Sequence, residues 1–563
     1  MTGRAVSVLT EVAPLDRPFT YVTTAATAHV AAGDRVRVTL NGRSVRGWVL
    51  GDANAISDML PLTKSLGYGP PGELLDLAAW VSDRWCAPLA RVLVSLTPTG
   101  VVASLPVAPR PVAPTHEPRR QWRPGPIHLA PTTDPLDVVL AAYGRVWNRP
   151  GSLLVLVPTE AWARRLRGRL AQRGLDVASG DQWAEMRAGW PVIVSARGGA
   201  LAPTPRLSGA VVIDADDEGY VSPMFPNWDA LTVVTERCRR DGADLWATSM
   251  APSPSLLALG ELERDPDFVG AWPALTVVDR RARDPHEGVL AAPALAAAQR
   301  ALASEEPVAV VVVLQRLGTG RLLACARCGE LARCTQCRQA EGDVEGGVAC
   351  ADRHEVREAF CRSCGATKLK RVRSGVTTLA RDVAAQLSQP VSEITRAASP
   401  EDLERVVVGT EAVFSRVRRC GVVIYADYDQ YLLAPHASAR RAAISAVGRA
   451  GRLVGGRREH RGEVVVQTRR GEDLVVTALE SLDFSGVIDA DVADARALGL
   501  APFGATAEVS GEGAAQLVEG LAAPGVRVVA GADGYVVRAP DALSLGRLLK
   551  GRAHSGRVRV AIR

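Results

Sequence analysis

Lysine is scarce in this chain of 563 residues, although basic residues are common. The 67 lysines and arginines include only four lysines, namely Lys64, Lys368, Lys370 and Lys550. A codon bias is the simplest explanation of this skew. The scarcity is still informative, because any chemistry that demands a lysine ammonium can be tested at just these positions.

Long apolar segments are also missing. The first residues lack the apolar core of a secretory signal, and the most apolar run, residues 307–314, is far too short to span a bilayer. We therefore expect a cytoplasmic protein with no membrane partner. Hydrophobic residues make up 47% and charged residues 23% of the chain, which excludes a disordered, collagen-like or wholly coiled-coil protein. The net charge of +6 weakly favours a nucleic-acid partner.

Changes in pattern along the chain indicate several domains. The first part alternates polar and apolar residues in short runs between turn signals and then becomes helical, which predicts a small β-barrel-like unit. A proline-rich basic linker follows. In the next two units, continuous apolar runs alternate with helical stretches, which favours parallel sheets covered on both faces. A last α/β segment completes the chain. The boundaries are 1–98, 99–126, 127–262, 263–474 and 475–563.

Seven of the ten cysteines lie between Cys325 and Cys364, inside the second α/β unit. Disulfides are not expected in a reducing cytoplasm, whereas each Cys-x2-Cys pair presents two thiolates to one tetrahedral zinc. A redox or incidental thiol cluster is the alternative. Seven cysteines and one histidine supply enough ligands for two zinc ions in a module at 322–368. The spacing is Cys325-x2-Cys328-x5-Cys334-x2-Cys337-x12-Cys350-x3-His354-x6-Cys361-x2-Cys364.

A nested pairing of these ligands is our interpretation, with both zinc sites structural. His354 is the least certain ligand, since it could instead be a surface histidine. Basic residues that follow the module either contact phosphate or form a solvated face. The first group is Cys325, Cys328, Cys361 and Cys364; the second is Cys334, Cys337, Cys350 and His354; the basic residues are Lys368, Lys370, Arg371 and Arg373.

Several short motifs occur along nearly the whole chain. They are VAPLDRPFTYV at 12–22, AAGDRVRVTL at 31–40, GTE at 409–411, SAVGRAGR at 445–452 and RALGLAPFG at 496–504. Together with the paired cysteine knuckles, they resemble the PriA family of replication restart proteins, which are superfamily 2 helicases. The resemblance implies a multidomain α/β fold. It comprises an N-terminal domain that binds a DNA 3′ end, two RecA-like helicase lobes with a binuclear zinc insertion, and an α/β C-terminal domain.

The resemblance also implies partners and DNA-contacting residues. The partners are branched or forked DNA with a 3′ end, primosome proteins, the replicative helicase or its loader, and single-stranded DNA-binding protein. Thr20 stands where many members have an aspartate, which weakens the match. Packing of Phe19 in a barrel core and a merely solvated face for the arginines are the alternatives. The candidate DNA residues are Phe19, Thr20, Tyr21, Gly33, Arg35 and Arg37, with Arg43 and Arg46 nearby.

The motifs for ATP hydrolysis depart from the family pattern. A P-loop needs a lysine to neutralise the β- and γ-phosphates, and none of the four lysines stands in that context. The corresponding segment, residues 127–140, reads IHLAPTTDPLDVVL and has no glycine. Where the family has Asp-Glu-Glu-His, this chain has Asp214-Ala215-Asp216-Asp217, so that a cation ligand remains at Asp214 but the catalytic glutamate is lost.

Two arginines of the sixth helicase motif, Arg449 and Arg452, are retained. In active relatives they reach toward the γ-phosphate; here, packing between the lobes or contact with the DNA backbone is the favoured alternative. Our leading hypothesis is a fork-binding replication restart protein without ATP-driven unwinding. One alternative is an ATP-dependent 3′–5′ DNA helicase with a degenerate nucleotide site. Another is a zinc-ribbon interaction scaffold without fork specificity. Two zinc ions are the expected cofactors, whereas binding of ATP is left open.

Overall fold

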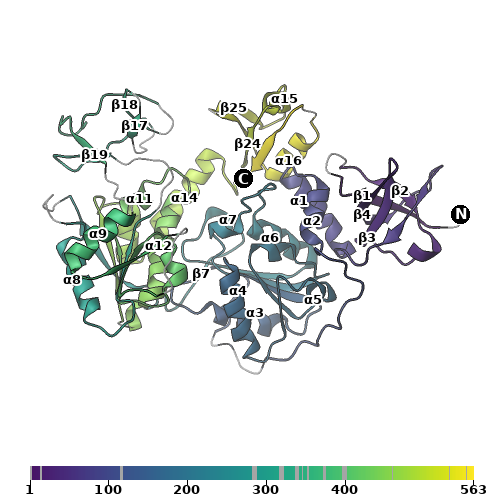
Figure 1. Ribbon diagram of the computed structural model, residues 1–563, viewed down its shortest axis with the longest axis horizontal. Helices are drawn as coiled ribbons and strands as arrows, with labels where there is room; N and C mark the ends of the chain where they lie inside the picture. Colours follow the sequence, from purple (N-terminus) through teal and green to yellow (C-terminus); the bar gives the residue numbers. More distant parts are fainter. Residues whose placement is uncertain are drawn as a thin grey trace.

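The computed structural model places five parts side by side (Figure 1). It describes all residues except 1–2, 13–15, 115–117, 119, 282–287, 316–322, 337–340, 345, 351–353, 372–375, 396–401, 460, 532 and 553–554. The first domain lies at one end of the molecule, lobe 1 in the middle and lobe 2 at the other end. The cysteine module lies above lobe 2, and the C-terminal domain lies above lobe 1.

The first domain is a curled, mainly antiparallel sheet in the order β5-β2-β1-β4-β3-β6, as the alternating pattern predicts. Its strands place Val6, Val8, Val36 and Val38 in a core on one face. On the other face, Trp48 packs against helices α1 (Leu75–Arg84) and α2 (Leu89–Leu96). The strands are β1 (Ala5–Thr10), β2 (Phe19–Val22), β3 (Arg35–Leu40), β4 (Arg43–Asp52), β5 (Leu60–Pro61) and β6 (Lys64–Ser65).

Lobe 1 is a parallel sheet with strand order β13-β7-β12-β11-β8-β10-β9, which confirms the predicted sheet type. Helices α3 (Pro135–Val146) and α4 (Glu160–Ala171) pack on one face, and α6 (Ala230–Asp241) packs on the other. The shorter helices are α5 (Trp183–Ala188) and α7 (Pro254–Leu257). The strands are β7 (Gly125–His128), β8 (Ser152–Leu156), β9 (Val177–Ser179), β10 (Val192–Ser195), β11 (Leu207–Val212), β12 (Asp244–Ser249) and β13 (Glu263–Arg264).

Lobe 2 is a second parallel sheet, in the order β14-β23-β22-β15-β21-β20. Helices α8 (Ala292–Leu302) and α9 (Val376–Leu387) cover one face, and α12 (Ala439–Val454) and α13 (Leu474–Ser481) cover the other. Two short helices are α10 (Val413–Arg416) and α11 (Asp429–Leu432). The strands are β14 (Ala274–Asp279), β15 (Val310–Val313), β20 (Val391–Ile394), β21 (Val406–Gly409), β22 (Val422–Tyr425) and β23 (Glu463–Thr468).

The cysteine module enters lobe 2 after β15 and ends before α9. It contains two small antiparallel ribbons, β16 (Leu323–Cys325) with β19 (Leu369–Arg371) and β17 (Gly342–Val344) with β18 (Gly347–Ala349). Its described apolar core is small, consisting of Leu323, Ala332 and Val348 with Leu369 packed against them.

The C-terminal domain follows helix α14 (Ser485–Leu498) and is a four-stranded antiparallel sheet in the order β25-β26-β24-β27. Helices α15 (Ala514–Val518) and α16 (Ala542–Lys550) join its strands to the buried cluster that also includes α1, α2 and one face of lobe 1. No described helix is long and apolar enough to cross a membrane. The strands are β24 (Ala505–Ser510), β25 (Arg527–Gly531), β26 (Gly534–Ala539) and β27 (Arg559–Ile562).

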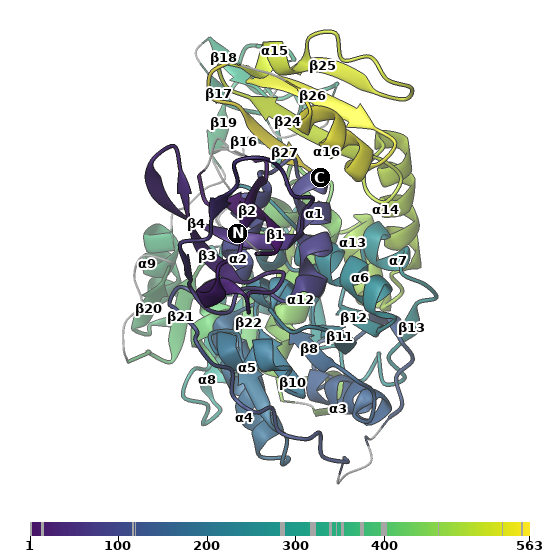
Figure 2. The same cartoon turned by 90° about the vertical axis from the view of Figure 1, so that its right-hand side faces the viewer.

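Helices α1 and α16 lie side by side, so the first domain and the C-terminal domain are in contact (Figure 2). A Cβ atom at Gly546 would stand 2.0 Å from the carbonyl oxygen of Asp83, so only glycine lets the two backbones approach this closely. Lys550, one of the four lysines, donates to the Ser82 hydroxyl at 2.5 Å and lies 3.3 Å from the Asp83 carboxylate. The first and last domains are therefore packed onto lobe 1 and onto each other.

We expect Gly546→Ala to lower the free energy of unfolding by about 1–3 kcal/mol, because the added methyl group overlaps a backbone carbonyl that cannot move freely. Urea denaturation followed by tryptophan fluorescence measures the change. The control is Gly168→Ala in α4, where a Cβ meets nothing within 4 Å. That substitution should be neutral or stabilising by up to about 1 kcal/mol. Equal stability of the two variants would show that the α1–α16 contact tolerates a side chain.

Candidate DNA-binding face, metal centres and interlobe cleft

The candidate stacking residues lie on strand β2. Phe19 and Thr20 are half-buried, and the guanidinium carbon of Arg17 lies 5.2 Å from the centre of the Phe19 ring. Tyr21 is buried, and its hydroxyl donates to the carbonyl oxygen of Thr39 at 3.0 Å. The structure therefore places Tyr21 in the core of the first domain and leaves Phe19 and Thr20 partly accessible.

Gly33 and Arg35 make contacts within the protein. Gly33 has φ +91°, and a Cβ there would stand 1.8 Å from the carbonyl oxygen of Pro70. Arg35 is 5% exposed, and its Nη1 donates to the carbonyl oxygens of Pro98 at 3.3 Å and Gly100 at 3.1 Å. Its guanidinium thus ties the sheet to the start of the linker.

Three exposed cations form a row across strands β4, β3 and β6, which we call the basic row. Arg37 pairs in register with Arg46 on one side and with Lys64 on the other. Directly opposed residues of antiparallel strands point to the same face, so these three side chains are neighbours. Arg46 also lies 2.8 Å from the Glu11 carboxylate. The sequence pattern pointed to Arg37 and Arg46 but not to Lys64, because the short strand β6 carries no periodicity of its own.

The outer cysteine group is brought together by two similar knuckles. The amide of Gly329 donates to the Cys325 carbonyl oxygen at 3.1 Å, and the amide of Gly365 donates to the Cys361 carbonyl oxygen at 2.8 Å. Both glycines have positive φ, +75° and +74°. Each of these turns presents two sulfurs on one side. The group consists of Cys325, Cys328, Cys361 and Cys364.

The sulfur positions of the outer group fit one zinc ion. The Sγ atoms of Cys325 and Cys364 are 3.5 Å apart, and so are those of Cys328 and Cys361. A tetrahedral site with Zn–S bonds of about 2.3 Å requires sulfurs about 3.8 Å apart. The nine described cysteines are free thiols, as metal ligation requires. Zinc held here would fix the two ends of the module to each other.

The inner group contains Cys334, Cys350 and His354. The Nδ1 atom of His354 lies 3.4 Å from the Cys350 sulfur and 3.8 Å from the Cys334 sulfur. Cys337, the fourth expected ligand, lies outside the described residues. Two thiolates and one imidazole nitrogen at these separations are a donor set that suits zinc. The structure therefore groups His354 with the two cysteines, as the nested pairing requires.

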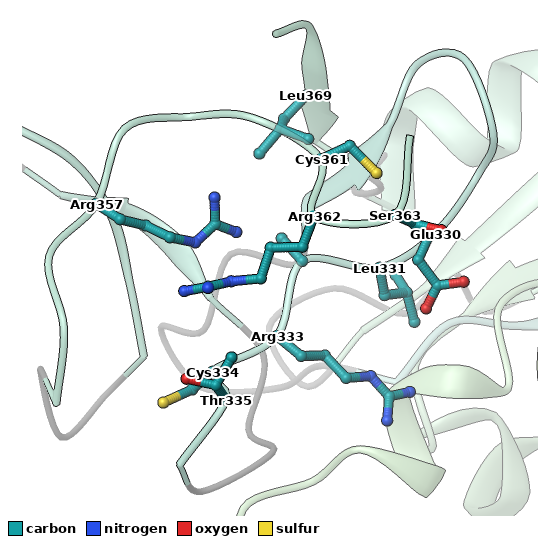
Figure 3. A pocket seen from close by; sticks show the side chains of 11 residues that line it. Glu330, Leu331, Arg333, Cys334, Thr335, Arg357, Cys361, Arg362, Ser363 and Leu369 are labelled. Carbon is teal, nitrogen blue, oxygen red and sulfur yellow. The ribbon is translucent and has the colours of Figure 1, made fainter. Parts of the chain in front are cut away.

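A cavity of about 530 Å³ lies between the two cysteine groups (Figure 3). Arg357 and Arg362 reach into it from one side, but both are already paired with acidic groups. Arg357 bonds to the buried carboxylate of Glu341, and Arg362 donates to Glu355 at 2.7 Å. These ion pairs brace the module. Of the basic residues near its C-terminal end, Lys368 and Lys370 are exposed, and Arg373 lies outside the described residues.

The three residues that the resemblance assigns to a nucleotide site, Asp214, Arg449 and Arg452, lie between the lobes. Arg452 of α12 donates to both carboxylate oxygens of Asp214, at 2.7 and 2.9 Å, and through Nε to the carbonyl oxygen of Pro131 at 3.2 Å. Arg449 donates to Glu411 at 2.8 Å within lobe 2. Arg452 and Asp214 are thus paired across the two lobes, whereas Arg449 is paired within lobe 2. The sequence did not reveal that Pro131 and Glu411 would be their partners.

The loop between β7 and α3, where the resemblance leads one to expect a P-loop, is also bound to its own chain. Asp134 caps α3 by accepting from the Leu136 amide at 3.0 Å, and it pairs with Arg169. The Thr132 hydroxyl donates to the Ala271 carbonyl oxygen at 2.9 Å. The end of this loop carries the Asp134 carboxylate, and a negative charge repels a phosphate.

Burial dominates the electrostatics of the aspartates that follow Asp214. It raises the pKa of Asp216 and of Asp217, and nearby Arg441 and Arg449 partly offset this effect. Asp216 accepts a hydrogen bond from the Ser253 amide at 3.0 Å. These carboxylates are therefore held by backbone amides of lobe 1, namely those of Ser253 and Gly219.

Comparison with known proteins assigns the first domain. Residues 7–98 match the family model of the 3′DNA-binding domain (3′BD) of PriA. The chain thus carries a 3′BD of the PriA type. It is 22% identical over 426 residues to replication restart protein PriA of Synechocystis sp., an alignment that covers 65% of this chain and 50% of that protein. The chain therefore spans about half the length of this curated relative.

Two solved structures have a weak overall similarity to the chain. One is a DEAD box protein from Methanococcus jannaschii, which is 11% identical with a TM-score of 0.30 and covers 64% of this chain and 86% of its own. The other is S. cerevisiae Dbp5 bound to RNA and ADP BeF3, which is 12% identical with a TM-score of 0.33 and covers 66% and 82%. The two parallel sheets described above, rather than these scores, define the RecA-like lobes beside the 3′BD.

Metal analysis of the purified protein should find two zinc ions per chain, one for each group. Cys325→Ser and Cys350→Ser should each remove one ion, because each takes a thiolate from a different group. Cys420→Ala is the control, since Cys420 is buried in the core of lobe 2 and belongs to neither group. Fewer than one ion in the unaltered protein would contradict both sites.

The double change Arg37→Ala with Lys64→Ala should weaken binding to 3′-ended DNA. The slope of log affinity against log salt should fall by about one unit for each phosphate contact that is lost. Fluorescence anisotropy at several salt concentrations measures both quantities. The control is Arg91→Ala, which removes one exposed cation of the same domain outside the basic row, on α2. An unchanged salt slope would remove the basic row from the DNA interface.

Proposed function

We propose that this protein is a replication restart factor that binds branched DNA at a 3′ end and promotes reloading of the replicative helicase without ATP-driven unwinding. The observation that carries the proposal is the 3′BD at residues 7–98. The distant similarity to a replication restart protein supports the same role. Phosphate contacts by the basic row would add affinity without reading sequence, which suits a protein that recognises fork shape.

The positions of the four lysines argue against ATP hydrolysis by the usual mechanism. Lys64 lies in β6 of the 3′BD, Lys368 and Lys370 lie in the cysteine module, and Lys550 ends α16. The loop before α3 thus has no lysine to hold phosphates, and Ala215 stands where a catalytic glutamate is needed. Phosphoryl transfer depends almost entirely on such electrostatic positioning, so losing both groups costs orders of magnitude in rate.

The pairing of Arg452 with Asp214 supports the same conclusion. In an active site these groups would contact the γ-phosphate and Mg²⁺, whereas here each has its hydrogen bonds satisfied by the other. A nucleotide would have to break this pair and leave buried charges without partners before gaining any contact of its own.

The cysteine module is proposed to contact other proteins of the primosome. It stands apart from the two lobe sheets and is braced by buried ion pairs rather than by a large core. The exposed lysines Lys368 and Lys370 give it a cationic edge for such contacts. The replicative helicase or its loader and single-stranded DNA-binding protein are the partners that this role implies.

Two assays on the full chain test the proposal. We expect tighter binding to a three-way fork with a 3′ end at the branch than to duplex of the same length. We also expect ATP turnover that stays at background with and without the fork. Equal binding to fork and duplex would favour an interaction scaffold without fork specificity. Fork-stimulated turnover that Arg449→Ala abolishes would establish the ATP-dependent helicase instead.

A further inference from the structure

Helix α12 of lobe 2 presents arginines to an acidic segment of lobe 1. The segment is residues 214–217, and it contains three aspartates. Arg452 makes the bidentate pair with Asp214 at 2.7 and 2.9 Å, and the side chain of Asp214 is only 10% exposed. Arg449 and Arg441 lie near enough to Asp217 and Asp216, respectively, to favour their charged forms. Opposite charges thus face each other along one side of α12.

Glycines let this helix lie directly on lobe 1. A Cβ at Gly448 would stand 2.5 Å from the Met250 sulfur and 3.4 Å from Pro131. At Gly451 it would stand 2.9 Å from Pro273, just before β14, and 3.5 Å from Pro131 of lobe 1. Side chains at these two positions would push α12 away from lobe 1 and lengthen the bonds of Arg452. The absence of side chains is therefore part of the same contact.

The apolar core also continues from one lobe into the other. Ala130 and Ala251 of lobe 1 belong to the same buried cluster as Val447 and Ala450 of α12. Next to them, the rings of Trp272 and Phe484 are 5.1 Å apart, and the rings of His128 and Phe268 are 4.5 Å apart. The interface between the two lobes is thus a packed apolar core with charged groups at its edge, rather than an open space for a ligand.

We propose that α12 and residues 214–217 form an intramolecular clamp that holds the two lobes in one closed arrangement without a nucleotide. Helicase lobes that respond to a nucleotide must favour different arrangements in its presence and absence, and a ligand can shift that balance only through differential contacts. Here Arg452 and Asp214, which could make such contacts, bind each other instead, and Arg449 is paired with Glu411 within lobe 2. The clamp fixes the cysteine module on lobe 2 relative to the 3′BD and C-terminal domain on lobe 1. The protein then offers partners one rigid surface.

Hydrogen exchange on the intact protein tests the clamp. The readout is the amide exchange of residues 129–134 and of α12, compared with that of the 3′BD in the same sample. Arg452→Ala and Asp214→Ala should each speed exchange at both places by about tenfold or more, because each leaves a charged partner unpaired. The double variant should add little to either single change, since both remove the same bond.

The matched control is Arg440→Ala. Arg440 lies on the same helix but pairs with Asp491 and Asp494 of α14, not with lobe 1. Its removal should leave exchange at residues 129–134 unchanged. Unaltered exchange of the 3′BD in every variant shows that the chain has folded. The charge swap Asp214→Arg with Arg452→Asp should restore part of the protection that the single changes lose.

Magnesium and ATP complete the test. Millimolar Mg·ATP should leave exchange of the unaltered protein unchanged at residues 129–134 and in α12. The clamp is refuted if these segments exchange as fast in the unaltered protein as in Arg452→Ala, or if Mg·ATP changes their exchange several-fold. Fork binding is not needed for either result, so failure of the clamp is distinguishable from failure of the proposed DNA-binding role.

Discussion

The ion pair between Arg452 and Asp214 joins lobe 2 to lobe 1. It lies where the resemblance to helicases would place the nucleotide. It spans 238 residues of sequence and is nearly shielded from water on the Asp214 side. Compared with apolar packing of similar volume, a buried ion pair adds little to the free energy of unfolding. Removing one partner is nevertheless costly, because the other charge is then buried without a partner. The lobes therefore keep one relative position, and the domains packed on each lobe keep theirs.

The helices α1 and α2 play the corresponding role on the other side of lobe 1. Their apolar faces belong to the buried cluster that includes α6 and the C-terminal domain, so the 3′BD is not a free appendage. The contact at Gly546 and the bonds of Lys550 add specificity to this packing. The basic row thus has a fixed orientation relative to lobe 1, and the proposed recognition of a branched shape depends on such an orientation.

The cysteine module is stabilised in a different way from the other domains. Its described apolar core contains only Leu323, Ala332 and Val348 with Leu369 packed against them, too few side chains to stabilise an independent fold. Metal coordination can supply the missing free energy, since binding energy at a structural zinc site is folding energy. Arg357 and Glu341, both buried and paired, add a rigid link between the two cysteine groups. This combination gives a compact module that projects from lobe 2 and needs no contribution from its core.

The sequence by itself determined the order of domains, the two parallel sheets and the cysteine pairs, because apolar runs and Cys-x2-Cys spacing are local signals. It also placed Arg37 in the DNA-binding domain and excluded a P-loop lysine. Only the tertiary structure decided that Tyr21 and Arg35 serve the fold of that domain, that Lys64 stands beside Arg37, and that Arg452 binds Asp214. Each of these depends on which strands pair and which lobe surfaces meet, and packing between segments far apart in the chain leaves no periodic trace in the sequence.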